Sequence, residues 1–213
     1  MYGQFFILFG LILVGYYCNK KGYLPLETNK NVGHMVMRVT IPAMLITTIA
    51  SIEITDRVLR AFLLSAAGQI AMMVVFGFLM RQYGRKRGLD SRLLPMLDLT
   101  AGSLNTGFIG LPVTMIFFGQ AGIIYMSAGV LALNLYLWSY GVYLISDKKA
   151  TGAAAIGKSF LQGAINPNCL SILLGLLLAV THTARFVPTV VLGFLTKVGD
   201  LSTPLSLIYI GAL

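Results

Sequence analysis

Long apolar runs, separated by short polar connections, fill almost the whole sequence. A helix needs about 20 apolar residues to cross the roughly 30 Å hydrocarbon core of a bilayer. The runs that approach this length lie near residues 2–18, 31–51, 58–80, 93–118, 121–146, 166–182 and 189–213. The pattern therefore predicts an all-α polytopic membrane protein with seven spans.

Composition supports this interpretation, since 57% of the residues are hydrophobic and 11% are charged. Soluble domains contain about 25% charged residues. The first run has no basic residue before it and is followed by Lys20 and Lys21 rather than by a small-residue cleavage site. We therefore expect it to be a mature span and not a secretory signal.

The basic residues are divided unevenly between alternate connections. Eleven of the 16 lysines and arginines follow the first, third and fifth spans. The positive-inside rule then places the odd-numbered loops in the cytoplasm and the N-terminus outside, in a multi-pass protein of the cell membrane. The net charge of +9 is explained by topology, and the dispersed basic residues predict no nucleic-acid partner.

The fourth run is interrupted by residues that leave helical geometry easily. Pro112 lacks an N–H group and clashes with the carbonyl four residues earlier, and Gly107 and Gly110 tolerate non-helical backbone. Within a membrane, irregular backbone is tolerated only inside protein or along a watery cavity. We therefore expect the helix to break at Pro112 and the break to hold a substrate, together with Asn105 and Thr106.

The chemistry of such a break favours an anion. The N-terminal end of the second half-helix would carry about half a positive charge and free N–H groups. Asn105 adds a donor and an acceptor. The alternative is a proline kink satisfied by neighbouring helices, with Asn105 as an interhelical hydrogen-bonder.

Two further polar residues in the spans have two interpretations each. Thr47, after Pro42 in the second span, either faces the same cavity or bonds back to its own helix. Asp98, six residues after Arg92, either couples transport to protons or simply reaches the cytoplasmic interface.

A weak internal repeat relates the first two spans to the sixth and seventh. Pro25 precedes Pro42 by 17 residues, and Pro188 precedes Pro204 by 16. Five spans separate the two copies, so they cross the membrane in opposite directions, as do the inverted repeats of secondary transporters. We expect a five-helix repeat over 1–146, a cytoplasmic connection over 147–163 and the start of a second repeat over 164–213.

Three motifs resemble the auxin efflux carrier family, which includes bacterial malate permease-like members. They are Asn105 to Val113, Asn166-Pro167-Asn168, and the end of the chain from Thr203 to Leu213. The resemblance implies two inverted five-helix repeats with broken, crossing fourth and ninth helices. It implies that this chain corresponds to about seven of ten spans, with an incomplete second repeat, and that Asn134 lines the substrate cavity; a packing role for Asn134 is the alternative.

Enzymatic motifs are missing from the sequence. It has no His-Glu-x-x-His helix. The predicted topology separates Asp98 and Asp200 toward opposite faces of the membrane, so they cannot form a catalytic pair. Because the two cysteines and two histidines do not cluster in the sequence, we expect no metal and no cofactor.

These observations predict a secondary transporter that moves a small organic anion, such as malate or an auxin-like carboxylate, by alternating access. The expected partners are the anion, the lipid bilayer and further copies of the chain in a homo-oligomer. The alternative is a non-transporting membrane fragment or an assembly subunit that lacks the second broken helix.

Overall fold

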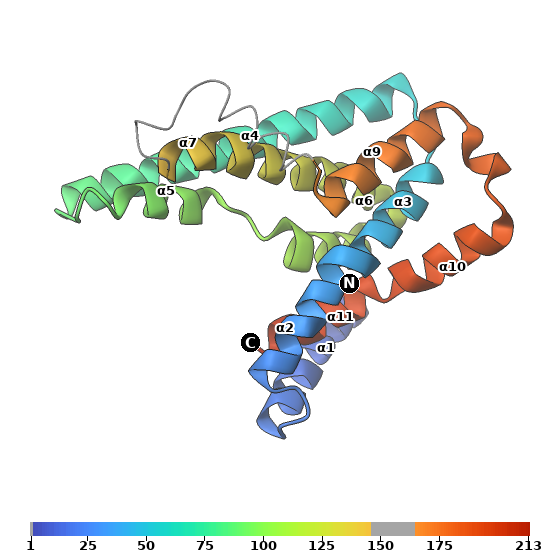
Figure 1. Cartoon of the computed structure of the whole chain (residues 1–213), viewed down its shortest axis with the longest axis horizontal. Coiled ribbons are helices and arrows are strands. Elements are labelled where there is room, and N and C mark those ends of the chain that lie inside the picture. Colours follow the sequence, from blue (N-terminus) through green and yellow to red (C-terminus); the bar gives the residue numbers. More distant parts are fainter. Residues whose placement is uncertain (1, 146–164) are drawn as a thin grey trace.

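The computed structural model describes residues 2–145 and 165–213, which form helices and connections without a strand (Figure 1). The predicted connection over 147–163 lies outside the described residues. In chain order the elements are α1 (Tyr2–Lys20), α2 (Leu26–Met35), η1 (Val36–Thr40), α3 (Ile41–Ala50), α4 (Asp56–Lys86), α5 (Leu94–Gly102), η2 (Thr106–Gly110), α6 (Leu111–Tyr136), η3 (Leu137–Gly141), α7 (Val142–Ile145), α9 (Pro167–Val180), η4 (Thr183–Phe186), α10 (Thr189–Asp200) and α11 (Ser202–Gly211). The elements η1, η2 and η3 are π-turns, and η4 is a 3₁₀ turn.

Four helical stretches of the described chain are long and apolar enough to cross a membrane: Leu26–Ala50, Asp56–Lys86, Leu94–Leu144 and Thr189–Gly211. The third has 51 residues and as one straight helix would be about 77 Å long, more than twice the hydrocarbon core. It turns at Gly119, whose φ of 64° and ψ of −157° are not helical. This stretch therefore contains the predicted fourth and fifth spans, and the protein is an all-α polytopic membrane protein.

Local signals explain where the longest helix begins and ends. The Thr55 hydroxyl accepts a hydrogen bond from the Val58 N–H at 3.3 Å and caps α4, with Asp56 in the first turn. Arg85 and Lys86 lie in the last turn. Acidic residues at the N-terminus and basic residues at the C-terminus stabilise a helix because they interact favourably with its dipole, and the cap satisfies a free N–H group.

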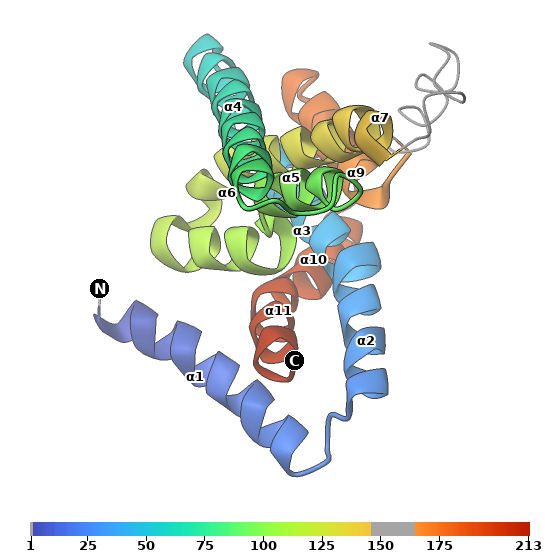
Figure 2. The same cartoon turned by 90° about the vertical axis from the view of Figure 1, so that its left-hand side faces the viewer.

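The helices pack in two groups that meet where α3 contacts α6. Helix α4 packs on α5 and α6, and α3 packs on α9 and α10. Figure 2 shows α11 between α1 and α2, and both helices contact it. The buried core that joins the groups includes Ile41, Leu45, Leu111, Ile123 and Ile172.

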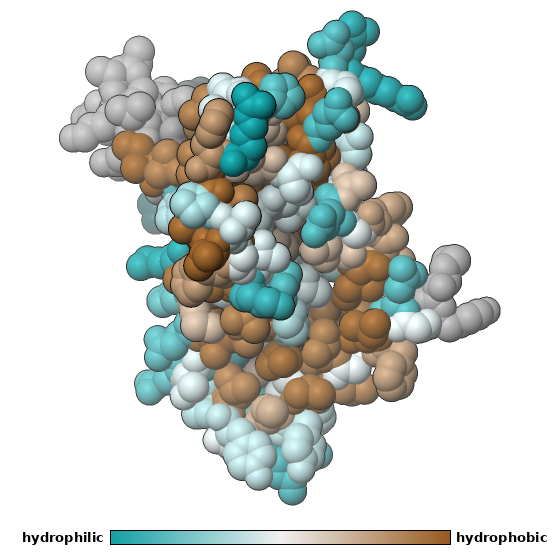
Figure 3. Space-filling view, turned by 90° about the vertical axis from the view of Figure 1, so that its right-hand side faces the viewer, coloured by the Kyte–Doolittle hydropathy of each residue, from teal (hydrophilic) through white to brown (hydrophobic). Residues whose placement is uncertain are grey.

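Large apolar side chains also cover much of the outside. Phe6 is 80% exposed and Val190 is 81% exposed. Figure 3 shows hydrophobic residues over much of the face that it views, with hydrophilic residues in smaller groups between them. Contiguous exposed apolar surface of this kind fits contact with lipid rather than water.

Candidate functional site

The predicted break in the fourth span is present, but it lies earlier in the sequence than expected. Helix α5 ends at Gly102, and residues 103–105 separate it from η2, which begins at Thr106. Pro112 is in the first turn of α6 and continues the second half-helix. The expectation that the helix breaks at Pro112 was therefore wrong.

The π-turn explains why Pro112 does not break the helix. The Gly110 N–H bonds to Asn105 O at 3.0 Å, and the Leu111 N–H bonds to Thr106 O, each five residues back. The wider turn moves the backbone away from the proline ring, whose clash with a carbonyl four residues earlier would otherwise kink an α-helix. Pro42 follows η1 in the same way.

Asn105 is the N-cap residue of the second half-helix. Its Oδ1 accepts a hydrogen bond from the Phe108 N–H at 3.1 Å. Within the described chain, the Asn105 Nδ2 and the N–H groups of Gly107 and Ile109 have no hydrogen-bond acceptor. Asn105 itself is exposed, whereas Thr106 is 2% exposed. Donors therefore gather at the positive end of the helical segment that Asn105 caps and that begins with Thr106 and Gly107.

The two glycines of this segment permit close contacts with other spans. A Cβ on Gly107 would lie 3.2 Å from Met37 Sδ of η1. A Cβ on Gly110 would meet the methyl group of Met126. Gly107 therefore connects the broken fourth span to the second, and Gly110 connects it to the fifth.

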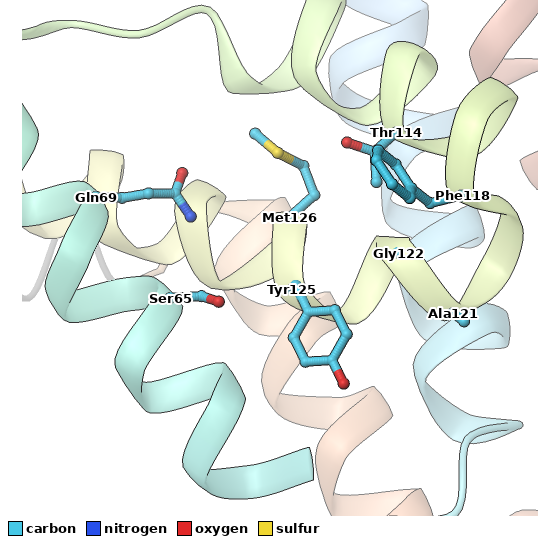
Figure 4. Close-up of a pocket in the computed structure, with 8 residues that line it drawn as sticks. All are labelled: Ser65, Gln69, Thr114, Phe118, Ala121, Gly122, Tyr125 and Met126. Atoms are coloured by element: carbon cyan, nitrogen blue, oxygen red, sulfur yellow. The ribbon is translucent and has the colours of Figure 1, made fainter.

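A mostly apolar pocket of about 440 Å³ lies between α4 and α6 (Figure 4). Ser65 and Gln69 of α4 face it from one side, and Thr114 and Phe118 of α6 face it from the other, with Met126 between them. Phe118 is 72% exposed. This pocket offers few charged or donor groups, so it suits an apolar group better than a carboxylate.

Thr47 lies apart from the break. Its hydroxyl donates to Ala43 O at 3.0 Å, as the interpretation of a bond within its own helix predicted. It also lines a smaller cavity of about 130 Å³ with Gln120 and Asp200. The structure therefore does not bring Thr47 together with Asn105.

Asn134 joins the fifth span to the sixth. Its Nδ2 donates to Val130 O at 2.8 Å, and its Oδ1 accepts a bond from Asn166 Nδ2 at 2.8 Å. Asn166 is also the N-cap of α9, because its Oδ1 accepts the Asn168 N–H at 2.8 Å. Two residues that the sequence singled out separately thus form one interhelical connection.

We expect Asn166→Ala to lower the free energy of unfolding by about 1 to 2 kcal/mol, because it removes an N-cap and leaves the Asn134 oxygen without a donor. The measurement is the thermal midpoint of the detergent-solubilised protein. Asn19→Ala is a control, because Asn19 also bonds backbone carbonyls but does not cap a helix. Equal midpoints for wild type and Asn166→Ala would contradict the role of this connection.

Asp98 is fully buried, with 0% of its surface exposed. Its Oδ2 lies 3.6 Å from Arg81 Nη1 and accepts a hydrogen bond from the Tyr140 hydroxyl at 2.9 Å, and the Tyr136 hydroxyl donates to Oδ1 at 3.5 Å. A Cβ on Gly77 would collide with the carboxylate. The carboxylate is therefore held inside an ion pair between α4, α5 and the fifth span.

Sequence reasoning missed the partners of Asp98, although a signal was available. Arg81 and Asp98 lie at similar distances from the turn that joins α4 and α5. Helices joined by a short loop pack antiparallel, so residues equally far from the loop face each other. Counting residues from the loop in both directions pairs Arg81 with Asp98 without knowledge of the fold.

Comparison with known proteins agrees with this architecture. Residues 1–213 match a family described as membrane transport protein. An uncharacterized transporter of Methanothermobacter thermautotrophicus is 26% identical over 204 residues, which make up 94% of this chain and 64% of that protein. The chain thus spans slightly less than two thirds of the length of this curated relative. Because the match covers the whole chain, the protein belongs to the membrane transport protein family, of the auxin efflux carrier type.

Proposed function

We propose that the protein is a secondary carrier that moves a small organic anion, such as malate or an auxin-like carboxylate, across the cell membrane by alternating access. The observation that carries this proposal is the start of the second half-helix in the fourth span. There Asn105 Nδ2 and the N–H groups of Gly107 and Ile109 lack acceptors among the described residues.

These groups match the chemistry of a carboxylate. The helix dipole places about half a positive charge at this end, and N–H groups at a helix N-terminus bind anions directly. Because the Oδ1 of Asn105 accepts the Phe108 N–H, the Nδ2 group of Asn105 is left as a donor for a ligand. Broken helices with such ends form the substrate sites of many secondary transporters.

Substitutions of Asn105 test the proposal without removing the cap. We expect Asn105→Ser to keep the second half-helix intact, because serine is a good N-cap residue. Asn105→Asp also caps the helix but adds a negative charge that repels an anion. Loss of a hydrogen bond to a charged group costs about 1.5 to 3 kcal/mol, so Asn105→Leu should weaken binding roughly ten- to a hundredfold.

The measurement is equilibrium binding of radiolabelled malate and indole-3-acetate to the solubilised protein, with stability followed in parallel. We expect the Asp and Leu variants to bind much more weakly than wild type, and the Ser variant to bind more tightly than either. Equal affinity in wild type and the Asp variant would show that the anion binds elsewhere. A stable wild-type chain that binds no organic anion would favour the assembly-subunit alternative.

A further inference from the structure

The second span contains a backbone carbonyl that the helix leaves free. In an α-helix the carbonyl of Met37 would accept the N–H of Ile41, but that N–H bonds to Val36 O instead. In a π-turn the donor would come from Pro42, which has no N–H. The Met37 carbonyl therefore receives no hydrogen bond from its own helix.

The fourth span repeats this arrangement. The Leu111 N–H, which would reach the carbonyl of Gly107, bonds to Thr106 O. The next residue is Pro112, so the Gly107 carbonyl also lacks a helical donor. Among the described residues, no side chain donates to either carbonyl in its place.

The two π-turns meet each other. The contact of Gly107 with Met37 Sδ joins η2 to η1. Helix α11 contacts both π-turns, and the Tyr209 ring stacks on Phe108 of η2 with ring centroids 4.5 Å apart. Three segments far apart in sequence therefore meet around the side chains of Met37, Phe108 and Tyr209.

Two contacts fix the register of the seventh span against the second. A Cβ on Gly199 would lie 2.8 Å from Met44 Cα, and a Cβ on Gly33 would lie 2.7 Å from the Tyr209 ring. Along α10 and α11 the two contacts are ten residues apart, from Gly199 to Tyr209. Along α2 to α3 they are eleven residues apart, and the chain passes them in the reverse order, Gly33 before Met44. The segments therefore run antiparallel, with one face of α11 along η1.

Two serines occupy that face between the contacts. Ser206 lies three residues before Tyr209 and so comes level with Met37, and Ser202 comes level with Ile41. Both are 0% exposed. Neither hydroxyl has a hydrogen-bond partner within residues 2–145 and 165–213. A buried hydroxyl without a partner costs about 1 to 3 kcal/mol, so these groups are explained best by a ligand.

We propose that the carbonyls of Met37 and Gly107 and the hydroxyls of Ser202 and Ser206 form a binding site for an alkali-metal cation, with Na⁺ as the preferred ion. All four ligand atoms are neutral oxygens. Hard cations prefer oxygen ligands, and divalent ions in proteins rely on carboxylates. The side chain of Arg38, the nearest charge in η1, is exposed and therefore directed away from this buried site.

The site also has a place in the transport cycle. Unwound carbonyls coordinate the coupling ion in several transporter folds. The π-turn that offers the Gly107 carbonyl is the same one whose N-terminal end is proposed to hold the anion. Binding of the cation would fix this turn and stabilise the anion through its charge. This coupling role rests on the proposed function, whereas the cation site does not.

The site is tested without any organic anion. The thermal midpoint of the solubilised chain is measured at equal concentrations of sodium, potassium, lithium or choline chloride. A ligand that binds the folded state stabilises it, so we expect a higher midpoint in sodium than in choline. Ser206→Ala and Ser202→Ala should each weaken the apparent Na⁺ affinity at least about tenfold, since an interaction with a charged group is lost.

Pro112→Ala and Pro42→Ala test the carbonyls separately, because each supplies the missing N–H and should also weaken Na⁺ binding. Ser127→Ala is the matched control: Ser127 is equally buried, but its hydroxyl donates to Ile124 O at 2.7 Å. A wild-type midpoint that is the same in all four salts would overturn the site. The site would also be overturned if the variants of the two serines and the two prolines all kept wild-type Na⁺ affinity.

The coupling role has its own readout, which is malate affinity in sodium against choline. We expect tighter malate binding in sodium. If sodium stabilises the protein but malate affinity does not change, the cation site stands and its coupling role is overturned. If malate does not bind at all, the proposed function fails while the sodium result still decides the site.

Discussion

Arg81→Gln is expected to lower the free energy of unfolding by about 3 to 5 kcal/mol, because it leaves the buried Asp98 carboxylate without its counter-charge. Asp98 is fully buried, and its remaining partners are the Tyr136 and Tyr140 hydroxyls. Two neutral donors cannot replace the charge of a guanidinium beside a buried carboxylate.

The reciprocal change should be milder. Asp98→Asn keeps an acceptor for the tyrosines, and the Arg81 side chain, 29% exposed, can extend to water. We expect the double variant Arg81→Gln/Asp98→Asn to recover much of the stability lost in Arg81→Gln. Thermal midpoints of the four proteins in detergent form a double-mutant cycle. Independent effects of the two substitutions would show that the pair contributes nothing.

Gly15→Ala and Gly211→Ala are expected to destabilise the contact between α1 and α11. A Cβ on Gly15 would collide with the Ile208 carbonyl, and a Cβ on Gly211 would collide with the Ile12 carbonyl. The obstacle in both cases is backbone, which cannot rotate away as a side chain can. Each substitution should therefore cost about 1 to 3 kcal/mol, and the double variant more.

Gly10→Ala in α1 is the control, because a Cβ there meets nothing within 4 Å. The measurement is the thermal midpoint of the solubilised protein. We expect Gly10→Ala to behave like wild type and the other two to unfold at lower temperature. Equal midpoints for all three variants would mean that α1 does not pack closely on α11. Small residues that let backbones approach are a general means of joining helices in membranes.

Some of the site was accessible from the sequence because its cause is local. Asn105 is an N-cap residue, and glycines follow it, so a helix start was predictable from residue types alone. The position of the break was not, because Pro112 acts together with a π-turn. A π-turn depends on how neighbouring helices hold the backbone, and local composition gives no signal for it.

The apolar runs by themselves determined the fold class, an all-α polytopic membrane protein, since hydrocarbon requires about 20 apolar residues and satisfied backbone groups wherever a helix crosses. Spacing along one helix cannot reveal contacts between helices. Only the tertiary structure decided that Asn134 meets Asn166 and that Ser206 comes level with Met37. Those pairings depend on the register and crossing of helices, which packing between distant segments sets.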